Sequence, residues 1–104
     1  MFFKAKFRNS LEDYALEKNN LVVDFDTILN KEVIYFKNHE FEIERTGEGF
    51  IKEINFCNQC VLTYNIEEIF IELIVNLLSD EEYVTLFDSD GLEEEMSKED
   101  LMDF

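Results

Sequence analysis

The sequence predicts a single α+β domain over residues 1–104, in which one apolar helix covers an antiparallel sheet of about four or five strands. Three observations predict this fold class. Residues of alternating polarity occupy the middle of the chain, and an apolar run with helical spacing follows them. The 104 residues also include no proline and only three glycines. So few breakers favour long regular elements with short connections, and this length is that of one domain.

Two elements are predicted ahead of the alternating segments. Residues 1–7 alternate weakly between apolar and charged residues, which predicts a short strand or an ordered arm. Residues 11–18 carry apolar residues at helical spacing. Ser10, with an acid three residues later, matches a helix N-cap. We therefore expect a short N-terminal helix.

The middle of the chain predicts an antiparallel meander. Residues 40–45 and 50–57 alternate in polarity, and the two glycines between them indicate a hairpin turn. Short apolar segments predict the other strands, at residues 21–25, 33–36 and 61–64.

The clearest element is a helix over residues 66–78, with Asn65 as its N-cap. Its β-branched residues favour a strand, but its length and the spacing of its polar residues favour a helix. Glu68, Glu72 and Asn76 recur every four residues, which places them in one narrow stripe. We expect the remaining apolar surface to cover the sheet.

The C-terminal quarter of the chain is strongly acidic. Ser79 followed by Glu82 matches a capping box, which predicts a short helix through Phe87. Residues 88–91 indicate a turn. Residues 92–104 predict an acidic helix or tail, and residues 88–104 together are a candidate mobile tail.

Net charge is the most unusual property of the sequence. The 25 acids and nine bases give a formal charge of −16, and residues 80–104 carry 11 acids against one base. Solubility requires a net charge of only about 2–8 in a small domain. The excess predicts complementarity to a basic protein surface. Nucleic acid and anionic membranes would be repelled, so neither is expected as a direct partner.

No catalytic, metal or cofactor site is predicted. Cys57 and Cys60 lack the further ligands of a structural zinc site, so we expect reduced structural cysteines, with a labile disulfide as the alternative. The single histidine, His39, falls in a predicted polar turn without a nucleophile or an orienting partner. A calcium-binding loop with Gly91 at its sixth position would have Leu86 and Ser97 at its first and last positions, where carboxylates are required.

The expected compartment is the cytoplasm. Residues 1–6 have no apolar core of a secretory signal. The longest apolar stretch, residues 69–78, contains Glu72 and Asn76 and is too short to span a bilayer.

The candidate partner-binding residues are three acidic groups with neighbouring aromatic anchors. One group repeats every second residue of a predicted strand, so its carboxylates would lie on one face about 6.8 Å apart. A second group would lie at a helix N-terminus, where the helix dipole stabilises negative charge. The acidic candidates are Glu40, Glu42, Glu44, Asp80, Glu81, Glu82, Asp88, Asp90, Glu93, Glu94 and Glu95, and the aromatic candidates are Tyr35, Tyr83 and Phe87.

In size and composition the chain is similar to two groups of bacterial inhibitors. One comprises immunity proteins that neutralise nuclease toxins, and the other comprises phage-encoded DNA mimics, including anti-CRISPR proteins. We favour the immunity type, because a richly apolar core suits a rigid binder. The predicted function is therefore non-enzymatic inhibition of a basic, nucleic-acid-acting protein, by a monomer or a homodimer. The alternative from another class is a small enzyme or ligand-binding module, which would need a cluster of polar residues that the sequence does not indicate. A third alternative is a structural or assembly protein that self-associates through its Phe-rich sheet.

Overall fold

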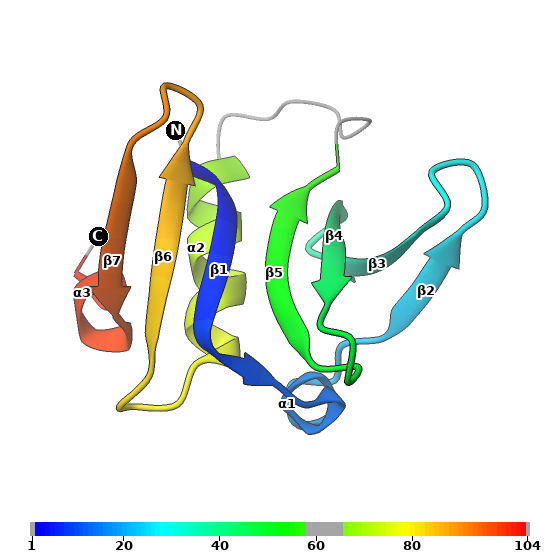
Figure 1. Ribbon diagram of the computed structural model, residues 1–104, viewed down its shortest axis with the longest axis horizontal. Coiled ribbons are helices and arrows are strands. Elements are labelled where there is room, and N and C mark those ends of the chain that lie inside the picture. The colour runs from blue at the N-terminus through cyan, green and yellow to red at the C-terminus, as the bar shows by residue number, and fades with distance from the viewer. Residues whose placement is uncertain (1, 58–65, 104) are drawn as a thin grey trace.

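The fold is a seven-stranded antiparallel sheet with one long helix on one face, as seen in a computed structural model that describes residues 2–57 and 66–103 (Figure 1). The strands are β1 (Phe2–Leu11), β2 (Val23–Asp26), β3 (Lys31–Phe36), β4 (His39–Arg45), β5 (Ile51–Phe56), β6 (Tyr83–Asp88) and β7 (Glu93–Ser97). The helices are α1 (Asp13–Lys18), α2 (Ile66–Leu77) and α3 (Lys98–Met102). The order across the sheet is β2-β3-β4-β5-β1-β6-β7.

The first strand connects two parts of the sheet. β1 pairs with β5 on one side and with β6 on the other, so it joins the β2–β5 meander to the C-terminal β6–β7 hairpin. The helix α2 lies in the chain between β5 and β6, and in space it lies behind β1 in Figure 1. The sheet therefore has one covered face and one open face.

The core forms between α2 and the covered face of the sheet. Phe70 of α2 packs against Phe41 and Phe56, with ring centroids 5.8 and 4.7 Å away. The polar stripe predicted on this helix is exposed, as its four-residue spacing requires. Burial of this aromatic cluster under the helix stabilises the fold.

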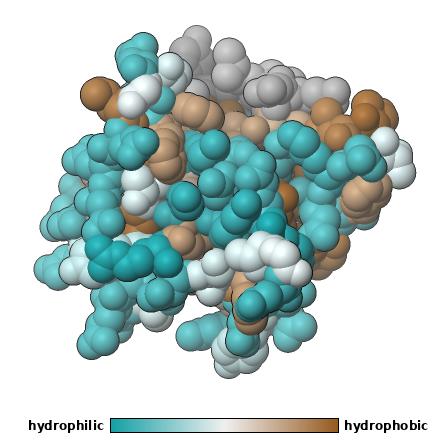
Figure 2. Space-filling model, viewed as in Figure 1, coloured by the Kyte–Doolittle hydropathy of each residue, from teal (hydrophilic) through white to brown (hydrophobic). Residues whose placement is uncertain are grey.

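Alternation along β1 separates the two faces. Ala5 and Phe7 are buried toward α2, whereas Lys4, Lys6 and Arg8 alternate with them toward the open face. Figure 2 shows the open face from the same side as Figure 1, with hydrophilic residues over most of its centre.

The sheet has more strands than the sequence predicts, because residues 83–88 form β6 rather than the end of a helix. Ser79 does make the predicted local contact, since its backbone N–H donates to Glu82 Oε1 at 3.0 Å. That contact closes a turn, and Val84 and Leu86 then alternate into the core as strand residues. Local capping chemistry therefore occurs here without a helix after it.

The predicted C-terminal helix is short and begins late. Residues 93–97 form β7, although consecutive glutamates disfavour a strand, because pairing with β6 overrides propensity. Helix α3 begins after Ser97, whose hydroxyl accepts from the Asp100 N–H at 3.2 Å in a capping box. Leu101 anchors this helix in the core.

The N-terminal strand is also longer than predicted, and the first helix starts later. β1 continues through Leu11, which is buried and pairs with Ile51. Ser10 is therefore a strand residue rather than a helix cap, and Glu12 occupies the N-cap position without a side-chain hydrogen bond. Burial of Leu11 in the sheet outweighs the capping signal.

His39 does not lie in a polar turn. It is the first residue of β4 and only 8% exposed, while Lys37 and Asn38 form the turn with positive φ angles of 49° and 68°. The predicted strand at residues 61–64, Cys60 and the Asn65 cap lie outside the described residues. No helix within the described ranges has the length and hydrophobicity needed to cross a membrane.

Candidate functional site

The open face of the sheet divides into two halves of different charge. We call the positions of β2, β3 and β4 on this face the acidic half; they are Asp24, Asp26, Lys31, Val33, Tyr35, Glu40, Glu42 and Glu44. Two of these side chains, Val33 and Glu42, are buried. Five carboxylates against one ammonium leave this half with a formal charge of −4.

We call the open-face positions of β1, β6 and β7 the mixed half. They are Lys4, Lys6, Arg8, Tyr83, Thr85, Phe87, Glu93, Glu95 and Ser97. Three cations against two carboxylates give a formal charge of +1. The strand β5 separates the halves and contributes Glu53 and Asn55.

The predicted glutamate ladder on β4 exists, but its three carboxylates have different surroundings. Glu42 is nearly buried and accepts a hydrogen bond from Lys31 Nζ at 2.9 Å. That contact, together with the Glu44 carboxylate, raises the pKa of Lys31, which therefore remains charged at neutral pH. The middle of the ladder is thus neutralised within the fold, and the negative charge offered to a partner lies at its two ends.

At one end, Glu44 pairs directly with Glu53 across β4 and β5. Burial raises the pKa of Glu53, and a hydrogen bond with the Glu44 carboxyl raises it further. Lys4 Nζ lies 3.7 Å from Glu53 and opposes this shift without cancelling it. Two carboxyl groups are therefore held together more closely than their charges favour, an arrangement that an added cation would stabilise.

At the other end, the Tyr35 ring lies among carboxylates. Partial desolvation raises the pKa of Tyr35, and the nearby Glu40, Asp24 and Asp26 raise it further. The phenol hydrogen-bonds Glu40, and half of the residue's surface remains exposed. Of the three predicted aromatic anchors, Tyr35 is the one surrounded by negative charge.

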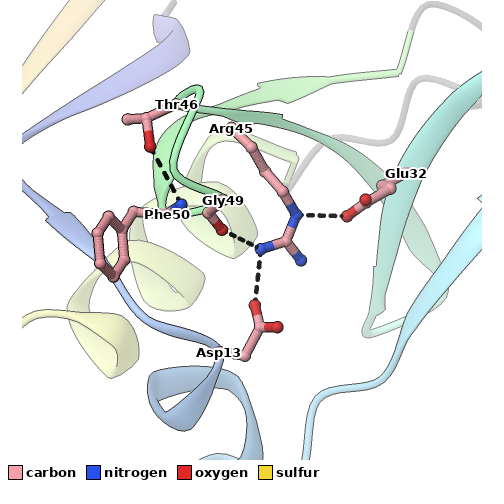
Figure 3. Close-up of polar contacts among 6 residues, drawn as sticks. All are labelled: Asp13, Glu32, Arg45, Thr46, Gly49 and Phe50. Atoms are coloured by element: carbon pink, nitrogen blue, oxygen red, sulfur yellow. Dashed lines mark hydrogen bonds and ion pairs between the residues drawn. The ribbon is translucent and has the colours of Figure 1, made fainter.

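The acidic half is held in place by a cluster of polar contacts around the partly buried Arg45 (Figure 3). Arg45 Nε donates to Glu32 at 2.7 Å, and its Nη1 donates to Asp13 at 2.8 Å and to the Gly49 carbonyl at 2.7 Å. One guanidinium thereby ties β3, α1 and the β4–β5 turn to β4. The strands that carry the carboxylates are fixed before any partner arrives.

In the mixed half, cations cover the other two predicted anchors. The Arg8 guanidinium lies 4.3 Å from the centre of the Tyr83 ring and forms an ion pair with Glu95. Lys4 Nζ lies 5.7 Å from the centre of the Phe87 ring. Internal contacts thus already use Tyr83, Phe87 and Glu95.

The remaining predicted residues are dispersed. Asp80, Glu81 and Glu82 lie in the turn between α2 and β6 rather than at a helix N-terminus, and Asp80 lies 3.7 Å from Lys98. Glu94 lies opposite Leu86 and faces away from the open face on which Glu93 and Glu95 lie.

Asp88 is the last residue of β6, and Asp90 lies in the turn that follows it. The Asp90 N–H donates to Asp88 Oδ1 at 2.7 Å, and this bond lowers the pKa of Asp88. The predicted acidic set therefore does not form one surface. Asp24, Asp26 and Glu53 instead lie on the same face as the glutamate ladder. Sequence reasoning missed them, although residues 23–26 alternate in polarity.

Within residues 2–57 and 66–103, no three histidine, cysteine, aspartate or glutamate side chains are close enough together to hold a metal ion. Comparison of the chain with protein-family models, with curated proteins and with solved structures found no match.

Proposed function

We propose that this chain is a non-enzymatic inhibitor that binds a basic, nucleic-acid-acting protein through the acidic half, in the manner of an immunity protein that neutralises a nuclease toxin. The observation that carries the proposal is the charge asymmetry of the open face. One half holds a formal charge of −4 around a half-exposed tyrosine, while three bases neutralise the other half.

The chemistry of such binding follows from the two ends of the ladder. A partner arginine or lysine that normally contacts phosphate would find paired carboxyl oxygens at Glu44 and Glu53. The exposed Tyr35 ring would supply aromatic contact area beside them. Because the sheet and the Arg45 cluster already order these groups, little conformational entropy is lost on binding.

The test compares two variants with the same loss of charge. Glu40→Gln with Glu44→Gln removes two carboxylates from the acidic half, and Glu93→Gln with Glu95→Gln removes two from the mixed half. The wild-type protein captures binding proteins from lysate. Association rates and inhibition of nucleic-acid cleavage are then measured with the captured protein, in purified form, over a range of salt concentrations.

We expect the first variant to associate at least about tenfold more slowly at low salt, because steering depends on complementary charge. We expect the second variant to behave like wild type. Capture of no basic protein would overturn the proposal, as would equal loss of association in both variants. A captured protein whose cleavage of nucleic acid is unaffected would also contradict it.

A further inference from the structure

The strand β2 is an edge of the sheet with an unusual surface. Among the described strands it pairs with β3 alone, so no described strand pairs with the other side of its backbone. Exposed apolar side chains concentrate beside it: Val22, Phe25 and Ile28 are 73%, 53% and 83% exposed. The opposite edge strand, β7, presents three consecutive glutamates instead, which disfavour the addition of another strand.

The β2–β3 hairpin projects beyond the cover of α2, as Figure 1 shows at the right of the sheet. Phe25 lies on the covered face by strand alternation, yet half of its surface is exposed. Such exposed apolar area on an edge strand is typical of an interaction surface.

The backbone of this edge points outward at defined residues. The Phe25 N–H donates to the carboxylate of its own neighbour, Asp24, at 2.8 Å. That N–H therefore points away from β3, and antiparallel alternation gives the backbone of Val23 the same orientation. The edge offers a short row of hydrogen-bonding groups, with one donor covered by a carboxylate.

We propose that the β2 edge accepts an extended segment of the basic partner as an additional strand, with lysine or arginine facing Asp24 and apolar residues facing Phe25. The inference rests on the proposed function, because it requires a basic partner, and it deepens that function by naming the segment that is held. Main-chain hydrogen bonds supply affinity in this mode, and alternate side chains supply specificity.

The Asp24 carboxylate explains why the segment must be basic. A cationic side chain on the incoming strand attracts this carboxylate toward the open face and releases the Phe25 N–H for pairing. A neutral strand leaves the donor covered. A second copy of this chain, with a net charge of −16, would bring Asp24 and Asp26 of each strand close to those of the other.

The test uses a synthetic eight-residue peptide of alternating lysine and valine. Two control peptides keep the side chains and charges but are methylated on the backbone. The first carries a methyl group on the backbone nitrogen of every valine, and the second carries one on the backbone nitrogen of every lysine. In strand addition only one of these sets of N–H groups faces β2. We expect one methylated peptide to bind at least about tenfold more weakly than the unmethylated peptide, and the other to bind nearly as well.

Two further measurements locate the site. Amide hydrogen exchange at Val23 and Phe25 should slow when the unmethylated peptide is bound. Asp24→Asn should weaken this peptide severalfold, while Glu93→Gln, a matched loss of one charge on the opposite edge, should not.

Equal binding of all three peptides would overturn the edge inference and leave the acidic half in place as an electrostatic surface. Failure of the unmethylated peptide to bind would also overturn it. The association rates of the variant with Glu40→Gln and Glu44→Gln then decide separately whether the proposed function stands. Dimerisation of the purified chain that is lost on Phe25→Asp would assign the edge to a second copy and contradict a basic partner.

Discussion

The acidic and mixed halves of the open face belong to one sheet but differ in how many bases lie near their carboxylates. The densest acidic sequence, residues 80–104, contributes Glu93 and Glu95 to the mixed half, where they lie near the bases of β1. The acidic half draws its carboxylates from strands in a less acidic part of the sequence. Strand register, rather than local density of charge, therefore decides which carboxylates act together.

The two ends of the sheet differ in apolar cover as well. At the β7 end, α3 packs through buried Leu101, although Leu92 and Met102 are exposed there. At the β2 end, Phe25 remains half exposed between the exposed Val22 and Ile28. The β2 end combines exposed apolar side chains with uncompensated negative charge, a combination that suits a partner which is both basic and apolar.

The largest expected effect comes from a change in the core that α2 forms with the sheet. Phe70→Ala removes the ring that packs against Phe41 and Phe56, and should lower the free energy of unfolding by about 3–5 kcal/mol. Phe25→Ala should change it by less than about 0.5 kcal/mol, because that ring covers little of the core. Urea unfolding of both variants measures the contrast. Equal losses would mean that Phe25 is a core residue after all.

A smaller effect is expected when one ion pair is broken in each half, and the two losses of stability are compared. Lys31→Met leaves the nearly buried Glu42 carboxylate without its cation, and should lower the free energy of unfolding by more than the loss of an exposed ion pair does. Arg8→Met breaks a pair between half-exposed side chains, and should cost less than about 1 kcal/mol. Thermal and urea unfolding at neutral pH compare them. A larger loss for Arg8→Met would show that the mixed half depends more on its cations.

The smallest effect concerns pH. Because the pKa of Glu53 is raised in the folded protein, the native state holds this proton more tightly than the unfolded state does. Its contribution to stability is complete below the ordinary glutamate pKa and is lost as pH rises through the folded value. Glu53→Gln, which mimics the protonated form, should stabilise the protein at neutral pH by about 0.2–1 kcal/mol.

This gain should disappear below about pH 4, where the wild-type carboxyl is also protonated. Glu95→Gln is the control, because it removes a carboxylate that is paired with Arg8, and it should give no gain at neutral pH. Unfolding curves measured across this pH range test the sign. A Glu53→Gln variant that is less stable at neutral pH would show that its contact with Lys4 outweighs the repulsion from Glu44.

The elements with long, periodic patterns could be predicted from residue order. The four-residue polar stripe of α2 and the two-residue alternation of β4 each specify one buried face, so both could be predicted from residue order alone. The α+β class followed from these elements. The same alternation placed Glu40, Glu42 and Glu44 on one side of their strand.

Long-range pairing, by contrast, determines the conformation of residues whose local preferences conflict with their environment. Ser79 and Glu82 make a helix-start contact that β6 does not continue, and Glu93–Glu95 form a strand because β6 offers them a partner. The candidate site depended on the same long-range pairing. Asp24 and Glu53 lie 29 residues apart in sequence and reach one face only through the register of β2 to β5. Residue order specifies each strand's two faces, but hydrogen-bonded pairing between strands specifies which faces coincide.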